Sequence, residues 1–281
     1  MAKRKLNNTK RTNWKKNLVW TVVTFVIMGV LFMAVERKKN AVITKVGISI
    51  KGIKGGKNLV TNKGVKTMFR NYLGYDLESS MIHDLDLMDM ELMLEADERI
   101  KEAEVYIDNK DRLYIAILQR EPIVRIFNKD RTSYYLDSDG KEIPSYKGAT
   151  IRVPVASGNI DAYDTKLIHA EKASSLKDVY TLAKYIHEDD FLSALIEQID
   201  VEDDGDITLI PKIGRQKLLF GSIEDREEMK GRFDKLKSMY KGGMQYVGWR
   251  KYDALKLEYD TKSKGKNGKE LYLIYGVKEE G

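Results

Sequence analysis

The sequence predicts a single membrane-spanning helix followed by two α+β domains outside the membrane. Three observations support this fold class: one long uncharged apolar run near the N-terminus, then a strand-helix-helix-strand-strand pattern, then short strands interrupted by helices. Of the 281 residues, about 245 remain after the tail and the apolar run, which is room for one large or two ordinary domains.

The apolar run is Leu18–Val35, which contains no charged residue and no proline. As an α-helix it spans about 27 Å, close to the thickness of the hydrocarbon core of a bilayer. The preceding tail, residues 1–17, is rich in lysine and arginine and has no acidic residue. The positive-inside rule then places the N-terminus in the cytoplasm and exports the chain after Val35. We therefore expect residues 18–35 to be a transmembrane helix in contact with lipid.

Two other interpretations of this run are weaker. A cleaved signal peptide has an apolar core of about 7–15 residues that ends at a small-residue site, and Phe32–Glu36 lacks that site. A buried helix of a soluble domain would rarely follow a tail made mostly of lysine, arginine and asparagine. An uncleaved anchor fits the run best.

Charge and cysteine content limit the function classes. The net charge is +6, but much of the basic excess lies in the N-terminal tail, where topology and anionic lipid account for it better than nucleic acid does. The chain has no cysteine, which excludes disulfides, thiolate metal sites and a cysteine nucleophile. The exported part must therefore be stabilised by its core alone.

The first domain is expected at residues 42–120. Period-two alternation predicts strands, apolar residues at helical spacing predict helices, and Gly74 is expected to end the first helix. The apolar face of the second helix is expected to comprise Leu85, Met88 and Leu92, with Met93 as a further candidate. The elements are expected at Val42–Lys51 (strand), Leu59–Leu73 and Asp84–Ala96 (helices), and Ala103–Asp108 and Leu113–Leu118 (a hairpin).

The second domain is expected at residues 121–260, because Pro122 cannot donate to a strand ladder and marks a natural boundary. It is predicted to be a mixed, mainly antiparallel β-domain with packed helices. Residues 261–281 are expected to be a flexible extension in which Leu271–Val277 is the candidate for a short strand. The expected strands are Ile123–Phe127, Ser133–Leu136, Ile143, Arg152–Val155, Ile199–Val201, Ile207–Ile210, Lys217–Phe220 and Tyr252–Tyr259, and the helices are Ser174–His187, Asp190–Ile196 and Ile223–Tyr240.

The search for catalytic and metal-binding patterns returns no site. Ser174–Lys177 and Ser238–Lys241 fit S-x-x-K, but the S-D-N and K-T-G strings that accompany it in penicillin-binding enzymes are missing. Asp200–Gly205 imitates a calcium loop, yet Pro211 stands where the bidentate glutamate belongs, so a hairpin turn is expected. The three histidines have no metal-ligand spacing. We predict no catalytic, cofactor-binding or metal-binding residue, and an interaction protein in place of an enzyme.

Several stretches resemble a known family. They are Lys101–Ile107, Leu113–Ile126 with its part Gln119–Ile126, Tyr134–Asp137 with Asp139–Lys141, Arg152–Gly158 and Gly248–Tyr252. On these residues the chain resembles the bacterial cell-division family FtsQ/DivIB, most closely its Bacteroidetes-type version. The resemblance covers the whole plan: a basic tail, one anchor, a POTRA domain at residues 42–120, and the family's β-domain.

The resemblance implies a non-enzymatic scaffold of the divisome, single-pass in the inner membrane with its C-terminus in the periplasm, and concentrated at the division septum. It implies no cofactor, nucleic acid or small-molecule substrate. The β-domain would bind an FtsB/FtsL-type complex by β-strand augmentation, and the POTRA domain would recruit other division proteins. The partner-binding residues it implies on the late strand and its approach are Arg250, Lys251, Tyr252, Ala254, Lys256, Glu258 and Tyr259.

Three alternatives stay open from the sequence. The late strand is an interior one if Leu271–Val277 folds back beside it, and the partner site then lies elsewhere. POTRA-like units also serve periplasmic protein export and outer-membrane assembly, which would require a barrel partner. A cell-wall hydrolase or transferase is the third class, and it lacks a nucleophile, base or metal set.

Overall fold

The computed structural model describes residues 14–39, 41–54, 58–146, 151–169, 173–223, 225–249, 251–257, 263–264, 270–271 and 275–277. The chain divides into two compact units. The first comprises Met1–Ser49, Asn62–Leu94 and Ala103–Ile117, and the second comprises Ile50–Thr61, Glu95–Glu102 and Leu118–Gly281. The domain limits expected from the sequence stay predictions.

The N-terminal helix α1 runs from Trp14 to Lys39, and its segment Trp14–Val35 is long and apolar enough to cross a membrane. None of that segment is buried in the protein. The helix is longer than the predicted Leu18–Val35 at both ends. Helical backbone continues past the apolar run because the flanking residues include lysine and arginine, which are good helix formers.

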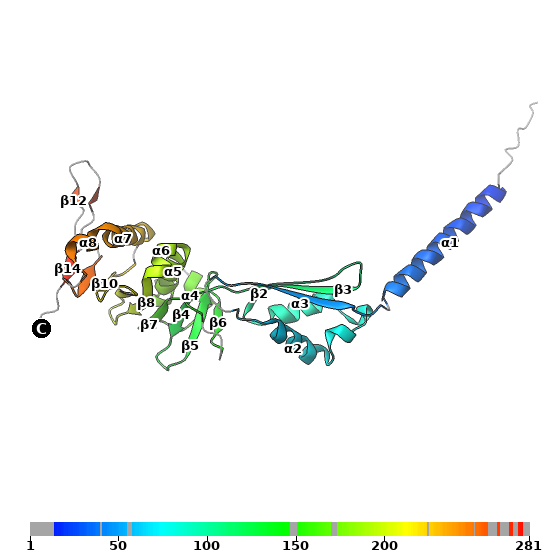
Figure 1. Ribbon diagram of the computed structural model, residues 1–281, viewed down its shortest axis with the longest axis horizontal. Helices are drawn as coiled ribbons and strands as arrows, with labels where there is room; N and C mark the ends of the chain where they lie inside the picture. The colour runs from blue at the N-terminus through cyan, green and yellow to red at the C-terminus, as the bar shows by residue number, and fades with distance from the viewer. Residues whose placement is uncertain are drawn as a thin grey trace, which may run out of the picture. The chain divides into compact units, whose positions relative to one another are not determined.

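The first unit follows the predicted order of one strand, two helices and two strands (Figure 1). Strands β1 (Lys45–Lys51), β3 (Arg112–Gln119) and β2 (Ile100–Ile107) form a three-stranded sheet in the order β1-β3-β2. Helix α2 (Asn62–Leu73) ends at Gly74, whose φ of 82° and hydrogen bond to Arg70 O confirm the predicted terminus. Short η1 (Leu77–Ser79) and η2 (Ile82–Asp84) lead to α3 (Leu87–Glu95).

The predicted apolar face is correct for Leu85, which is buried just before α3, and wrong for Met88 and Leu92 on the helix itself. Met90 and Leu94 are buried, whereas Met88 is 70% exposed and Leu92 59% exposed. The leucine and methionine residues of this helix lie on several of its faces, so helical spacing alone does not indicate which face is buried. Glu91 selects it: its carboxylate accepts a hydrogen bond from the backbone N–H of Val105 in β2 at 2.7 Å, which fixes the rotation of α3 beside the sheet.

The second unit contains a nine-stranded mixed sheet in the order β14-β11-β10-β9-β8-β7-β4-β5-β6. Among its described strands, the pairs β4–β7, β7–β8 and β10–β11 are parallel and the other five pairs are antiparallel. The strands are β4 (Pro122–Phe127), β5 (Ser133–Asp137), β6 (Glu142–Pro144), β7 (Val155–Gly158), β8 (Ile196–Val201), β9 (Ile207–Pro211), β10 (Lys217–Leu219), β11 (Ala254–Lys256) and β14 (Tyr275–Val277).

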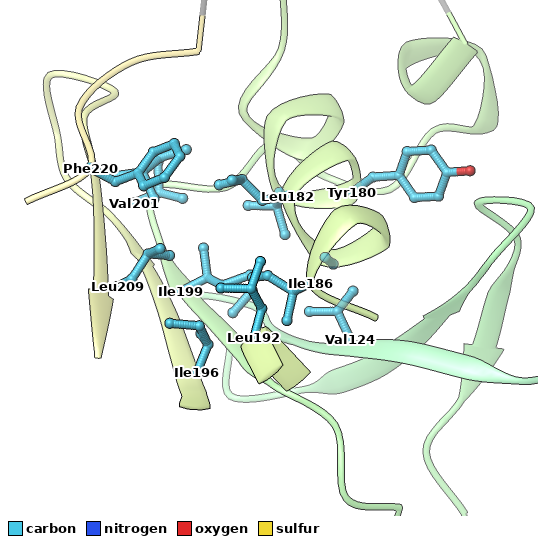
Figure 2. Packing of buried hydrophobic residues seen from close by; sticks show 14 of the residues in the cluster. Val124, Tyr180, Leu182, Ile186, Leu192, Ile196, Ile199, Val201, Leu209 and Phe220 are labelled. Carbon is cyan, nitrogen blue, oxygen red and sulfur yellow. The ribbon is translucent and has the colours of Figure 1, made fainter. Parts of the chain in front are cut away.

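Helices pack against the sheet and close its core. Figure 2 shows Leu182 and Ile186 of α5 and Leu192 of α6 directed toward the strand residues Ile199 and Leu209. All five of these side chains are fully buried. The helices of the unit are α4 (Thr165–His169), α5 (Ser175–Glu188), α6 (Asp190–Leu195), α7 (Arg226–Ser238), the π-helix η3 (Met239–Gly243) and α8 (Met244–Val247).

Most predicted elements of this unit are found, but several differ in extent, and α4 and α8 were not predicted. Strand β7 begins at Val155 and not at Arg152, because Pro154 has no N–H and contributes only its carbonyl, which accepts from Arg125 N. Helix α4 was not predicted, since five residues are too short for a periodic pattern. The late strand is shorter than Tyr252–Tyr259, and Glu258 and Tyr259 lie outside the described residues.

The C-terminal extension contains short strands. Tyr275–Val277 forms β14, and β12 (Ser263–Lys264) pairs with β13 (Glu270–Leu271) in a separate two-stranded sheet. The sequence offered one strand in this region, at Leu271–Val277, and the structure places a strand in its last three residues.

Candidate functional site

Strand β11 is held firmly on one side by β10. The two strands pair in parallel, with Lys217, Leu218 and Leu219 opposite Ala254, Leu255 and Lys256. Backbone hydrogen bonds of 2.9 Å extend this ladder at both ends, from Lys217 N to Asp253 O and from Leu257 N to Leu219 O. Leu255 and Leu257 are buried in the main core. These apolar side chains fix the late strand in the sheet.

The segment before β11 is tied to the loop that precedes β10. The Gln216 side chain is 1% exposed, and its amide nitrogen donates to Trp249 O. The rings of Tyr240 and Trp249 meet edge to face, with their centroids 5.6 Å apart. Burial raises the pKa of the Tyr240 hydroxyl to about 12, so it stays protonated and donates to Ile213 O at 3.3 Å. The approach to the late strand is therefore positioned by side chains far from it in sequence.

The structure brings four of the predicted partner-binding residues together. Lys251 is exposed and its ammonium lies 5.3 Å from the centroid of the Tyr252 ring, within cation–π range. Tyr252 is half-buried and packs against the core. Ala254 and Lys256 lie on β11 itself. The other three predicted residues, Arg250, Glu258 and Tyr259, lie outside the described residues.

On the side away from β10, β11 pairs with β14 of the same chain. The two strands are antiparallel, with Ala254 opposite Val277, Leu255 opposite Gly276 and Lys256 opposite Tyr275. A further hydrogen bond of 3.0 Å runs from Asp253 N to Val277 O. The sequence left open whether this edge is occupied, and the structure shows that it is, so a partner strand can pair with β11 only if β14 leaves the edge.

Gly276 lies directly against the ring of Tyr252. A Cβ added at Gly276 would overlap Tyr252 Cγ and Cδ1, the ring atoms nearest the backbone, which cannot swing away freely. Glycine is therefore required at this position for β14 and Tyr252 to keep their places. Neither periodicity nor a motif indicates this contact in the sequence.

At the opposite end of the sheet, the outermost described strand is β6. It has three residues and its last is Pro144, which lacks an N–H donor. Strands β11 and β14 at the other end are equally short but contain no proline, so the missing donor is what makes β6 the poorer edge. The β11–β14 end is therefore the better candidate for strand pairing with a partner.

A cavity of about 480 Å³ lies on the helical side of the second unit. Its lining includes His169, Tyr180, Lys184 and Arg226. Lys184 Nζ donates to Ser138 O at 3.2 Å and Tyr180 OH donates to the same carbonyl at 2.8 Å. Two of the polar side chains thus attach α5 to the turn after β5, which is a structural role.

The strings that imitate active-site motifs have other roles in the structure. Ser174 Oγ donates to Asp161 Oδ2 at 2.8 Å, and Ser238 Oγ donates to Asp234 O at 2.9 Å. The calcium-like string forms the turn between β8 and β9, closed by the hydrogen bond from Glu202 N to Asp206 O and by Gly205 at φ 92°. Among the described residues, no group of three or more His, Asp or Glu side chains is arranged to hold a metal ion.

Comparison with known proteins gives one family and no curated relative. Residues 121–262, which are half of the chain, match the family described as FtsQ/DivIB, C-terminal related. The search of curated proteins finds no match. The matched residues include every strand from β4 to β11, and β14 follows them. The chain belongs to the FtsQ/DivIB C-terminal-related family, whose members are related to cell division and are generally non-enzymatic.

Proposed function

We propose that this protein is a non-enzymatic, single-pass scaffold of the bacterial division machinery that links other division proteins at the septum. The observation that carries the proposal is the family match over residues 121–262, which contains the late strand β11. The resemblance of the first unit to a POTRA domain adds a second recruiting module, for division proteins other than those bound by the sheet.

The N-terminal helix supports a membrane location. Trp14–Val35 is long and apolar enough to span a bilayer, and none of it is buried in the protein. A signal sequence can meet the same criteria of length and composition, but its apolar core is usually shorter, and residues 32–36 lack a small-residue cleavage site. We propose an uncleaved anchor in the inner membrane, with the basic tail in the cytoplasm and the chain after Val35 in the periplasm.

The proposed mechanism of partner binding is β-strand augmentation at the β11 end of the nine-stranded sheet. In this mode, backbone hydrogen bonds supply affinity and alternate side chains supply specificity. Lys251, Tyr252, Ala254 and Lys256 lie at this end of the sheet, together with Arg250, Glu258 and Tyr259 in the sequence. The FtsB/FtsL-type membrane proteins that the family resemblance implies are the proposed partners.

Depletion and imaging in the source bacterium test the proposal. Depleting the protein is expected to produce filamentous cells, and a fluorescent fusion is expected to gather at midcell. A second fusion carrying only residues 1–39 controls for general membrane targeting, and it is expected to spread over the whole membrane. Normal division after depletion, with an even membrane distribution of the full chain, would contradict the proposal. Co-purification with an outer-membrane barrel in place of division proteins would favour an export role.

A further inference from the structure

We propose that β14 is a resident strand that occupies the partner edge of β11, and that a partner engages this protein by replacing β14 with an extended segment of its own. This inference rests on the proposed function, because it concerns how the same edge is used. The structure supports it with three observations: β11 is stable without β14, β14 is weakly attached, and one glycine controls whether β14 fits.

Strand β11 keeps its place when β14 is removed. Its parallel pairing with β10, extended at both ends by the bonds at Asp253 O and Leu257 N, does not involve β14. The buried side chains of Leu255 and Leu257 anchor it in the core. Loss of β14 would therefore expose an ordered strand edge with unpaired backbone groups, which is the surface that strand addition requires.

The attachment of β14 is slight by comparison. It pairs with β11 over three residues, as β10 does, but Val277 is 39% exposed, and Gly276 is exposed and has no side chain to bury. Glycine is also among the residues least favoured in strands. Among the described strands β14 is the outermost and pairs on one side only, so its detachment costs little compared with unfolding of the sheet.

The position of β14 after the matched residues agrees with a resident strand. The family match ends at residue 262, whereas β14 begins at Tyr275. The strands within the matched residues thus end at β11, and β14, which follows those residues in the sequence, adds one more strand beside β11. A partner strand is expected to run antiparallel to β11, as β14 does, and to place a small residue against the Tyr252 ring. Exposed Lys251 favours an acidic side chain at the end of that strand.

The test uses the full chain in lipid nanodiscs and a labelled synthetic peptide with the sequence of residues 270–281 as the probe. Two variants change the occupancy of the β11 edge by β14 in opposite directions. Gly276→Val should displace β14, because its side chain overlaps Tyr252. The pair Ala254→Cys/Val277→Cys places two cysteines at opposed positions and should hold β14 in place once oxidised. The natural chain has no cysteine, so no other disulfide can form within this variant.

The expected result is a binding order. G276V should bind the peptide at least about tenfold more tightly than the natural chain, because the binding-competent state is no longer a minor one. The oxidised cysteine pair should lose binding, and a reductant should restore it to the level of the natural chain. The control Gly242→Val should bind as the natural chain does, since a Cβ at Gly242 meets nothing within 4 Å.

Two results would overturn the inference. If the oxidised pair and the reduced pair bind the peptide equally, the strand adds outside β14 and no replacement occurs. If G276V, with an unchanged circular dichroism spectrum, binds no better than G242V, the β11 edge does not accept a free strand. These binding measurements use purified protein. They are therefore independent of the midcell localisation experiment that tests the proposed function. A chain that gathers at midcell but fails the peptide test loses only the replacement mechanism.

Discussion

Single side chains set the stability of the helical layer, and Asp189 is the clearest example. It precedes α6 and accepts a hydrogen bond from Leu192 N at 2.9 Å, while Lys237 Nζ of α7 lies 2.6 Å from its other oxygen. Burial pushes the pKa of this carboxyl upward, but the bonds from Lys237 and from the backbone outweigh it and lower the pKa below its ordinary value of 3.8. One carboxylate therefore joins two helices.

Replacing Asp189 with asparagine should keep the helix cap and remove the ion pair. Near neutral pH we expect Asp189→Asn to lower the free energy of unfolding by about 1 kcal/mol. Because the folded pKa is depressed, this contribution is present above pH 3.8 and disappears as the pH falls through the folded pKa. Urea unfolding of the full chain in detergent micelles, followed by circular dichroism, measures the difference at each pH.

The neighbouring Asp190→Asn is the matched control for this series. Asp190 pairs with Lys54, but the two side chains are 88% and 66% exposed, so its loss should change stability little. A difference between Asp189→Asn and the natural chain that stays constant from pH 7 to pH 2.5 would show that the carboxylate charge is not the source of the effect.

Residue contacts of this kind are the part of the site that the sequence does not predict. Lys251, Tyr252 and Ala254 were selected because they lie on or beside a recognisable late strand. Gln216 and Tyr240 support the same approach from other elements, but a glutamine after an arginine and a tyrosine in a helix have many ordinary roles. Their function depends on contacts across 33 and 9 residues of sequence with Trp249, which only the folded chain creates.

At the scale of elements, helix α7 is attached to the sheet by a buried arginine. Arg232 is 4% exposed, and its guanidinium donates to Phe220 O at 2.5 Å, to Ser222 O at 2.6 Å and to Glu228 at 2.7 Å. The two carbonyls belong to the segment that leaves β10, the neighbour of the late strand. Arg232 thus connects the helical layer to the end of the sheet where partner binding is proposed.

Arg232→Met should lower the free energy of unfolding by about 3 kcal/mol, because it leaves buried carbonyl oxygens and a glutamate without their donor. Thermal unfolding of the full chain in detergent micelles measures this loss. Lys230→Met, at an exposed position of the same helix, should leave the midpoint nearly unchanged and serves as the control. Equal midpoints for the two variants would show that the Arg232 bonds contribute no net stability.

Elements with strong periodicity or turn chemistry were predictable, and short ones were not. The hairpin between β2 and β3 and the end of α2 at Gly74 follow from local sequence alone. The buried face of α3 does not, because it depends on the bond from Val105 to Glu91. Strand β14 was visible only as a candidate, since three residues carry too little pattern to show where they pair.

At the scale of the whole molecule, the sequence predicts the plan of one apolar helix and two α+β regions, and the structure contains that helix, a three-stranded sheet and a nine-stranded mixed sheet. The plan is predictable because each part has its own hydrophobic pattern. Which strand occupies the edge at β11 cannot be predicted from the sequence. It depends on pairing between segments about twenty residues apart and on one glycine packed against a tyrosine ring.

Site-specific photocrosslinking in dividing cells tests most directly whether the β11 end of the sheet binds a division partner. A photoreactive amino acid replaces Lys256 on β11 in the full chain, and the matched variant carries it at Glu142 on β6, the opposite end of the sheet. We predict that the probe at position 256 captures a single-pass division protein of the FtsB/FtsL type, whereas the probe at position 142 does not. Capture of that protein only from position 142, or equally from both, would contradict the account.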